Sequence, residues 1–276
     1  PKDKIKGKNQ LNRLPEVRAL LLAAGLGSRL RPLTEKWPKC LMPIGDRPLL
    51  EYWLETLYSL KVSKVLINLC HHHEIVKEFL NRARFENWVE SAFEENLLGT
   101  AGTIRANHQF FQDCTTLLVH ADNWCQCNFS DFLNYHFIHR PKHCPITMMT
   151  FKTLTPETCG IVETDKEGVV FGIHEKIKKP PGCQANGAVY LLEPEVLKWI
   201  GKHSEIGDFS TELLPNYLGR IATWNNAGIH RDIGELPMLL KAQFDPQPTS
   251  CWPQRDSWQK DFLNQPIHSK IAQKTT

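Results

Sequence analysis

The sequence predicts an α/β fold in which helices flank a mixed, mostly parallel sheet. Short apolar segments alternate with amphipathic segments over the first 140 residues, which is the pattern of a doubly wound sheet. The first apolar segment, residues 17–24, is almost uninterrupted and stops at Gly25, as expected for a strand buried on both faces. A chain of 276 residues is long enough for one large domain, or two small ones, with a sizeable core.

The expected elements follow one another closely along the first half of the chain. After the strand at 17–24, further strands are expected over residues 64–69, 88–93 and 116–120. Helices are expected between and after them, over residues 52–60, 74–84, 103–111 and 129–140. Beyond Pro145 the rhythm loosens, and we expect strands at 146–151, 160–164, 169–174 and 188–192, then helical stretches at 195–200 and 211–218.

Three parts of the chain differ in composition. Residues 1–15 are Lys-rich and polar, so we expect a basic mobile tail. Residues 16–243 are expected to form the folded domain, with residues 141–243 as an elaboration on the same sheet. Residues 244–276 contain four prolines and two tryptophans, which predicts an irregular tail that packs back through its Trp rings.

Composition narrows the function classes. The formal charge of 33 − 30 = +3 is too small to indicate a nucleic-acid-binding protein. The sequence contains no run of about 18 apolar residues, so no membrane span is predicted. The polar start does not look like a signal peptide. Nine scattered cysteines are therefore expected to be reduced thiols in a cytoplasmic protein.

A glycine-rich loop follows the first strand. Gly25 and Gly27 allow backbone N–H groups to face an anion, and Arg29 and Lys39 supply cationic side chains for phosphate oxygens. The third glycine of a dinucleotide-binding loop is absent, because Leu30 stands there. The Lys-Ser/Thr ending of a P-loop is absent as well. The sequence thus predicts a phosphate-binding loop of a third kind.

Two aspartates follow expected strands and form a candidate metal site. Asp122 comes two residues after the strand at 116–120, at the end of the sheet where α/β proteins bind ligands. Asp232 follows another expected strand. Either aspartate alone would equally fit a surface turn or a helix cap. Together they suit Mg²⁺, which takes one or two carboxylates and completes its shell with phosphate oxygens and water.

The glycine loop resembles the signature of the sugar-1-phosphate nucleotidyltransferases, G-x-G-[ST]-R-L-x-P-L-T followed by P-K-P. The likeness is close from Gly25 to Lys39 and departs at Cys40, where the family usually has Pro. Later segments recur in the family's order, so the resemblance extends over about residues 16–240. It implies the Rossmann-like fold of nucleotide-diphospho-sugar transferases. It also implies an NTP and a sugar 1-phosphate as substrates, with Mg²⁺ as cofactor.

The resemblance also implies roles for individual residues. The nucleotide is expected to contact Leu22, Ala23, Ala24, Gly25, Gly27, Ser28, Arg29, Lys39, Gly99 and Thr100. The sugar phosphate is expected to contact Gly160, Glu175, Lys176 and Asn186, which lie in the part at 141–243. Arg29, Lys39 and Asp122 are the expected catalytic residues, and Asp122 and Asp232 the expected Mg²⁺ ligands.

Some positions depart from the family's pattern. No proline directly follows Lys176; it comes later, at Pro180 and Pro181, which implies a small insertion in this loop. The last motif, usually D-I-G-T, here ends in Glu235. His120 stands where many members carry Asn or Gly, and the resemblance assigns it no role.

The expected reaction is attack of the sugar phosphate on the α-phosphorus of the NTP, which needs no general base because the nucleophile is already an anion. The stretch from Glu94 to Gly102 resembles guanylyltransferases that act on mannose or heptose 1-phosphates, which favours GTP over UTP, CTP and dTTP. A uridylyl- or cytidylyltransferase remains an alternative. A glycosyltransferase and a non-catalytic nucleotide-sugar sensor are others, although the D-x-D motif expected of a glycosyltransferase is absent at Asp122. The oligomeric state is open, with a homo-oligomer as one alternative.

Overall fold

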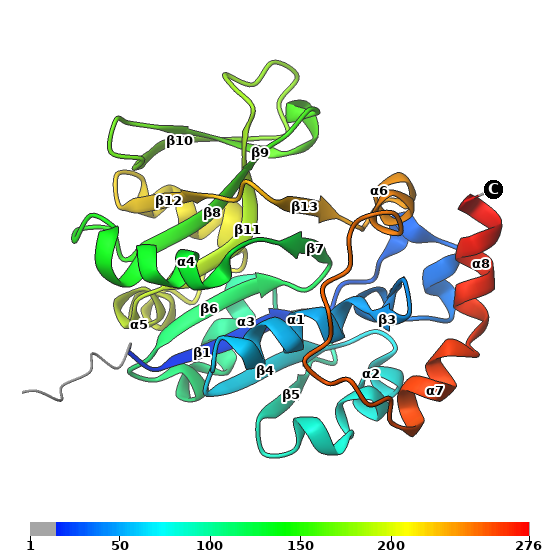
Figure 1. Ribbon diagram of the computed structural model, residues 1–276. Helices are drawn as coiled ribbons and strands as arrows, with labels where there is room; N and C mark the ends of the chain where they lie inside the picture. The colour runs from blue at the N-terminus through cyan, green and yellow to red at the C-terminus, as the bar shows by residue number, and fades with distance from the viewer. Residues whose placement is uncertain (1–14, 276) are drawn as a thin grey trace, which may run out of the picture.

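A computed structural model describes residues 15–275 of the chain (Figure 1). The basic tail expected over residues 1–15 therefore lies outside the described residues, except for Pro15. Along residues 15–275, no helix combines the length and the apolar character that crossing a bilayer requires.

Within residues 15–275, nine strands form one mixed sheet. Its parallel part has the order β5-β4-β1-β6, and the antiparallel strand β11 joins β6 to β8. Strand β12 pairs in parallel with β8, while β9 and β10 extend from β11. The strands are β1 (Val17–Leu22), β4 (Lys64–Leu69), β5 (Val89–Phe93), β6 (Thr115–His120), β8 (Ile146–Lys152), β9 (Gly160–Thr164), β10 (Val170–Glu175), β11 (Gln184–Leu192) and β12 (Ile221–Asn225).

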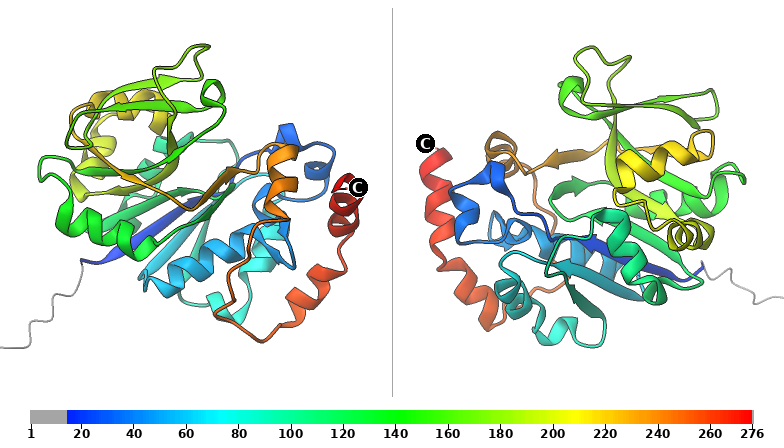
Figure 2. Two further views of the ribbon diagram at one scale, coloured as in Figure 1. Left: turned by 45° about the horizontal axis from the view of Figure 1, so that its top comes forward. Right: turned by 180° about the vertical axis from the view of Figure 1, so that it is seen from behind.

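Helices cover both faces of this sheet, as the two views in Figure 2 show. One face is covered by α1 (Leu49–Ser59), α2 (His73–Leu80) and α4 (Phe129–Asn134). The apolar side chains of these helices share one core cluster with those of α6 (Leu236–Ala242), which lies next to the end of the sheet (Figure 1). The other face is covered by α3 (Thr100–Ala106) and α5 (Pro194–Lys202), which belong to a second cluster. Strand β1 contributes to both clusters because its successive side chains point to opposite faces.

The fold class predicted from the sequence is confirmed. The strands expected at 64–69 and 160–164 have these bounds in the structure. The helix expected at 103–111 is α3 followed by the 3₁₀ turn His108–Phe111. The helix expected at 129–140 is α4 followed by the π-helical turn Tyr135–His139. Two small ribbons complete the fold, β2 (Pro43–Ile44) with β3 (Arg47–Pro48), and β7 (Asn123–Gln126) with β13 (Ile229–Asp232).

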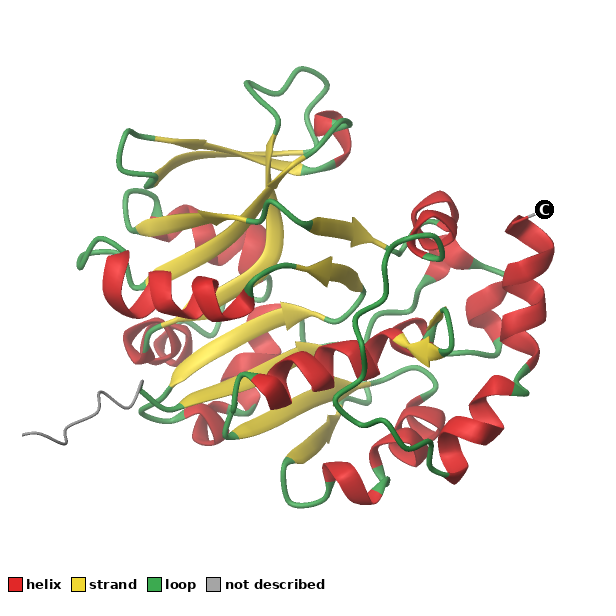
Figure 3. Ribbon diagram, in the orientation of Figure 1, coloured by secondary structure: helices red, strands yellow, loops and turns green. Residues whose placement is uncertain are grey.

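The prediction that residues 244–276 are irregular is wrong in part. Residues 244–275, here called the C-terminal strap, contain α7 (Ser257–Leu263) and α8 (Pro266–Thr275), which follow an extended stretch (Figure 3). The Asp256 carboxylate caps α7 by accepting a hydrogen bond from the N–H of Gln259 at 2.9 Å, and Pro266 occupies the first position of α8, where its missing N–H costs nothing. The Trp rings pack back as expected, Trp252 against Tyr58 and Phe85 and Trp258 against Phe79.

Candidate active site

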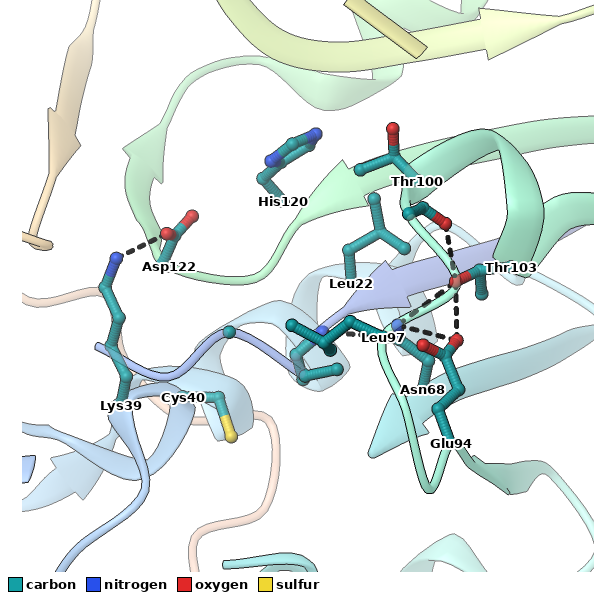
Figure 4. A pocket seen from close by; sticks show the side chains of 14 residues that line it. Leu22, Lys39, Cys40, Asn68, Glu94, Leu97, Thr100, Thr103, His120 and Asp122 are labelled. Atoms are coloured by element: carbon teal, nitrogen blue, oxygen red, sulfur yellow. Dashed lines mark hydrogen bonds and ion pairs between the residues drawn. The ribbon is translucent and has the colours of Figure 1, made fainter. Parts of the chain in front are cut away.

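The main candidate site is an open cavity of about 210 Å³ at the carboxyl ends of β1 and β6. Leu22 and His120 end these strands in parallel register, side by side. Eight residues of the cavity wall are ones that the sequence singled out: Leu22, Ala23, Ala24, Gly25, Lys39, Gly99, Thr100 and Asp122. Six others had no predicted role: Cys40, Asn68, Glu94, Leu97, Thr103 and His120 (Figure 4).

The glycine loop leaves β1 and bends sharply at Gly27. This residue has φ +62°, in the left-handed region, and a Cβ there would lie 2.8 Å from Cγ2 of Thr34. The Thr34 hydroxyl donates a hydrogen bond to the Gly27 carbonyl at 2.7 Å and so fixes the bend. A glycine is therefore required at this position. Gly27 and the following Ser28 do not line the cavity, although both shape the loop that carries Arg29.

The predicted phosphate and metal residues converge on one cluster of charges. The Lys39 ammonium, only 9 % exposed, lies 2.5 Å from Oδ2 of Asp122 and 3.6 Å from Oδ1 of Asp232. The Arg29 guanidinium lies 3.3 Å from Oδ2 of Asp232. Glu235, the residue that departs from the family's pattern, accepts a hydrogen bond from Arg29 at 2.6 Å. Arg29, Lys39, Asp122 and Asp232 thus meet as the sequence predicted, and Glu235 joins them.

The ribbon β7–β13 brings the two aspartates together. Its register pairs Asn123 with Asp232, so Asp122 lies directly beside the end of β13. The Ile233 N–H donates to the Asp122 carbonyl at 3.1 Å, which closes the ribbon. Next to it, a Cβ on Gly234 would lie 2.5 Å from the Lys39 ammonium nitrogen. The same Cβ would lie 2.7 Å from Oδ1 of Asp232, so a side chain at position 234 would displace the charged ends of Lys39 and Asp232.

The electrostatics of Asp122 favour an ionised carboxylate. Burial acts to raise its pKa, but the positive charge of Lys39, with a smaller effect of His120, outweighs burial and lowers the pKa. The carboxylates of Asp122 and Asp232 are oxygen ligands of the kind that Mg²⁺ takes. The neighbouring thiol of Cys40 adds no charge, because burial raises its pKa to about 12.

A buried polar network forms the opposite end of the cavity. Glu94 is 5 % exposed, and its Oε1 accepts hydrogen bonds from Thr103 at 2.5 Å and from Asn68 at 3.1 Å. Its Oε2 accepts from the Leu98 N–H at 3.2 Å. The amide oxygen of Asn68 accepts from the Ala23 N–H at 2.8 Å. In the sequence, the indication of this network is one polar residue, Asn68, inside an otherwise apolar strand.

The predicted acceptor residues lie on β9, β10 and β11. Gly160 pairs with Glu175, and a Cβ on Gly160 would lie 2.5 Å from the Glu175 carboxylate and 3.9 Å from Cβ of Asn186. Asn186 donates a hydrogen bond to the Tyr190 hydroxyl at 2.7 Å. These three residues are therefore grouped. Lys176 has φ +50°, is exposed and makes no ion pair within residues 15–275.

These features match a known family. The family described as nucleotidyl transferase matches residues 18–247, and the chain belongs to this family. The chain is 29% identical, over 233 residues, to a putative mannose-1-phosphate guanyltransferase of Sulfolobus acidocaldarius, with 81% of this chain and 63% of that protein covered. It is 30% identical, over 216 residues, to a UTP–glucose-1-phosphate uridylyltransferase of Synechocystis, with 72% and 54% covered. The resemblance to sugar-1-phosphate nucleotidyltransferases is confirmed.

A solved structure shows the same fold. The crystal structure of a putative glucose-1-phosphate thymidylyltransferase from Bacillus anthracis, in complex with a sucrose, superposes with a TM-score of 0.73 at 19% identity. The comparison covers 84% of this chain and 98% of that one. By contrast, the chain covers 63% of the length of the Sulfolobus relative and 54% of the length of the Synechocystis relative.

Proposed function

We propose that the protein transfers a nucleotidyl group from an NTP to a sugar 1-phosphate, with release of pyrophosphate. The carrying observation is the cluster of Arg29, Lys39, Asp122 and Asp232, of which Lys39 and Asp122 line one end of the cavity. Two anionic substrates must be held in line for this reaction, and their repulsion must be offset. The cluster supplies fixed cations for that task, and the sugar phosphate brings its own nucleophilic oxygen.

The charges of the cluster suggest how the substrates share it. Lys39 and Arg29 pair with carboxylates in the structure, and a triphosphate would compete for both cations. Asp122 and Asp232 would hold Mg²⁺, which supplies neutralisation and orientation of phosphate oxygens when bound. The group of Gly160, Glu175 and Asn186 would bind the sugar. Lys176 would contact its phosphate, since its ammonium has no partner of its own within residues 15–275.

We further propose that GTP is the preferred nucleotide. A carboxylate has about four lone-pair sites, and the Glu94 network uses three of them. The remaining site can accept a hydrogen bond from one of the adjacent N–H groups of guanine. Uracil offers one N–H, which stands between two carbonyl oxygens. A carboxylate placed there would repel these two oxygens. The relatives include a protein named as a guanyltransferase and one named as a uridylyltransferase. The choice of base is therefore supported mainly by Glu94.

The test measures pyrophosphate release for four NTPs against mannose, heptose and glucose 1-phosphates in the presence of Mg²⁺. We expect the highest kcat/KM with GTP. Glu94→Gln should reduce the preference for GTP over UTP by roughly ten- to a hundredfold, as for loss of a charged hydrogen bond. Glu95→Gln is the matched control, because Glu95 is exposed next to it. Pyrophosphate release from no pair, with consumption of a nucleotide sugar instead, would indicate a glycosyltransferase.

A further inference from the structure

His120 lies at a junction in the site and has no role so far. It is the last residue of β6, and its side chain lines the cavity between Asp122 and Thr100 (Figure 4). In this view Leu22 lies between His120 and the network of Glu94. The imidazole is therefore on the phosphate side of the cavity, away from the residues that suit a base.

The imidazole also lacks a partner. Its Nε2 atom is buried and makes no hydrogen bond to any of residues 15–275. A buried polar atom without a hydrogen bond is costly, and folded proteins rarely keep one without a reason. Because the imidazole lines the cavity, a turn of the ring would bring this nitrogen to a bound substrate, which could supply the missing partner.

The sheet opens toward the acceptor residues next to His120. Strand β11 pairs with β6 as far as Val189 opposite Val119, and His120 has no partner on β11. There β11 bulges, since its register with β8 shifts between Asn186 and Tyr190. Ala188 has φ +52°, and its N–H donates to the Asn186 side chain at 3.0 Å. The strand that carries Asn186 thus bends away from β6 beside the imidazole.

We propose that His120 binds the sugar 1-phosphate by a hydrogen bond to one of its oxygens. The inference rests on the proposed function and deepens it by assigning a residue to the acceptor. An imidazole N–H can donate a hydrogen bond to a phosphate oxygen or to the oxygen of a sugar hydroxyl, and both groups belong to this substrate. The position between Asp122 and the bulge of β11 places the ring where the two substrates meet.

The experiment compares His120→Ala and His120→Gln with the wild type. Steady-state kinetics give KM for GTP and for mannose 1-phosphate, and calorimetric titration gives the affinity for each substrate separately. His120→Ala should raise KM and Kd for mannose 1-phosphate roughly tenfold, as for one lost hydrogen bond, with GTP affinity within about twofold. His120→Gln, which keeps an N–H donor, should recover part of the loss. His139→Ala is the control, because His139 is exposed outside the cavity.

The outcomes separate this proposal from the proposed function. An unchanged sugar-phosphate affinity in His120→Ala, or a loss confined to GTP, would overturn the role of His120. Melting temperatures decide whether a loss reflects unfolding, because a folded variant keeps the wild-type value and GTP affinity. If the wild type released no pyrophosphate with any pair, the proposed function would fail. The titration with mannose 1-phosphate would still test His120 in that case.

Discussion

Arg82 connects the C-terminal strap to the domain, and replacing it should be severely destabilising. Its side chain is 4 % exposed, and it donates to Asp256 of the strap at 2.7 Å and to Glu51 of α1. Glu51 is fully buried. Arg82→Met keeps an unbranched side chain but removes the guanidinium, whose central carbon lies 5.1 Å from the centre of the Phe79 ring. Among residues 15–275, Glu51 would then keep only Arg84 as an ion-pair partner, at 3.7 Å.

The magnitude follows from the charge left behind. Removing one partner of a buried ion pair typically costs about 3–5 kcal/mol. For a domain of this size that corresponds to a melting temperature lower by roughly 6–20 °C. Asp256→Asn is the milder comparison, because Asp256 is 30 % exposed and its amide could still cap α7. We expect it to cost about 1 kcal/mol or less.

Urea denaturation and thermal melting at pH 7 would measure both variants. Pyrophosphate release well below the transition should be close to that of the wild type, because neither residue lines the cavity. A melting temperature for Arg82→Met within about 2 °C of the wild type would refute the reasoning.

The ion pair between Arg82 and Asp256 predicts that the stability of the fold depends on pH. Burial acts to raise the pKa of Asp256, but hydrogen bonds from Arg82 and from the Gln259 N–H outweigh it, so the folded-state pKa is lowered. A lowered pKa contributes stability above the unfolded-state value, and this stability is lost as pH falls through the folded-state value. Acid titration of the wild type should therefore show a loss of stability that is smaller in Asp256→Asn.

Four further substitutions test the site. Asp122→Asn should nearly abolish turnover while the variant stays folded, because the change is almost isosteric and Asp232 still lies 3.6 Å from the Lys39 ammonium; near-normal rates at ordinary Mg²⁺ would exclude the metal assignment. Lys39→Ala should weaken NTP binding or slow the chemical step by about ten- to a hundredfold, whereas Lys176→Ala should mainly raise KM for the sugar phosphate; kinetics in both substrates would reveal a reversed pattern. Gly160→Ala should displace Glu175, whose carboxylate lies 2.5 Å from the added Cβ, and raise KM for the sugar phosphate, while unchanged kinetics would argue against the grouping of these residues.

The sequence predicted the parallel part of the sheet well because its strands carry strong local signals. Strand β4 is an apolar run between polar segments, and its predicted bounds match the structure. The tail was harder, because α7 begins from a cap at Asp256 and is held by Phe262 against Trp37, far away in the sequence. Proline content suggested irregularity, but the prolines at 246, 248 and 253 are confined to the extended stretch.

The site shows the same division between local and long-range information. The glycine loop and Asp122 stand in short motifs at strand ends, so their types and spacing could be interpreted directly. Glu94 was visible only as one acidic residue in an acidic stretch, and its burial depends on Thr103 and Asn68 from other elements. The missing partner of His120 Nε2 could not be foreseen either, because the burial of one ring nitrogen depends on the packing of several elements.

The ribbon β7–β13 has a consequence for the order in which the site is assembled. Every residue of the cavity wall lies between Leu22 and Asp122, whereas Asp232 reaches the site only when β13 pairs with β7. During synthesis the cavity segment emerges first, and the second carboxylate follows 110 residues later (232 − 122). Contacts between such distant segments close a long loop and tend to form late. Turnover would then report completion of the whole domain.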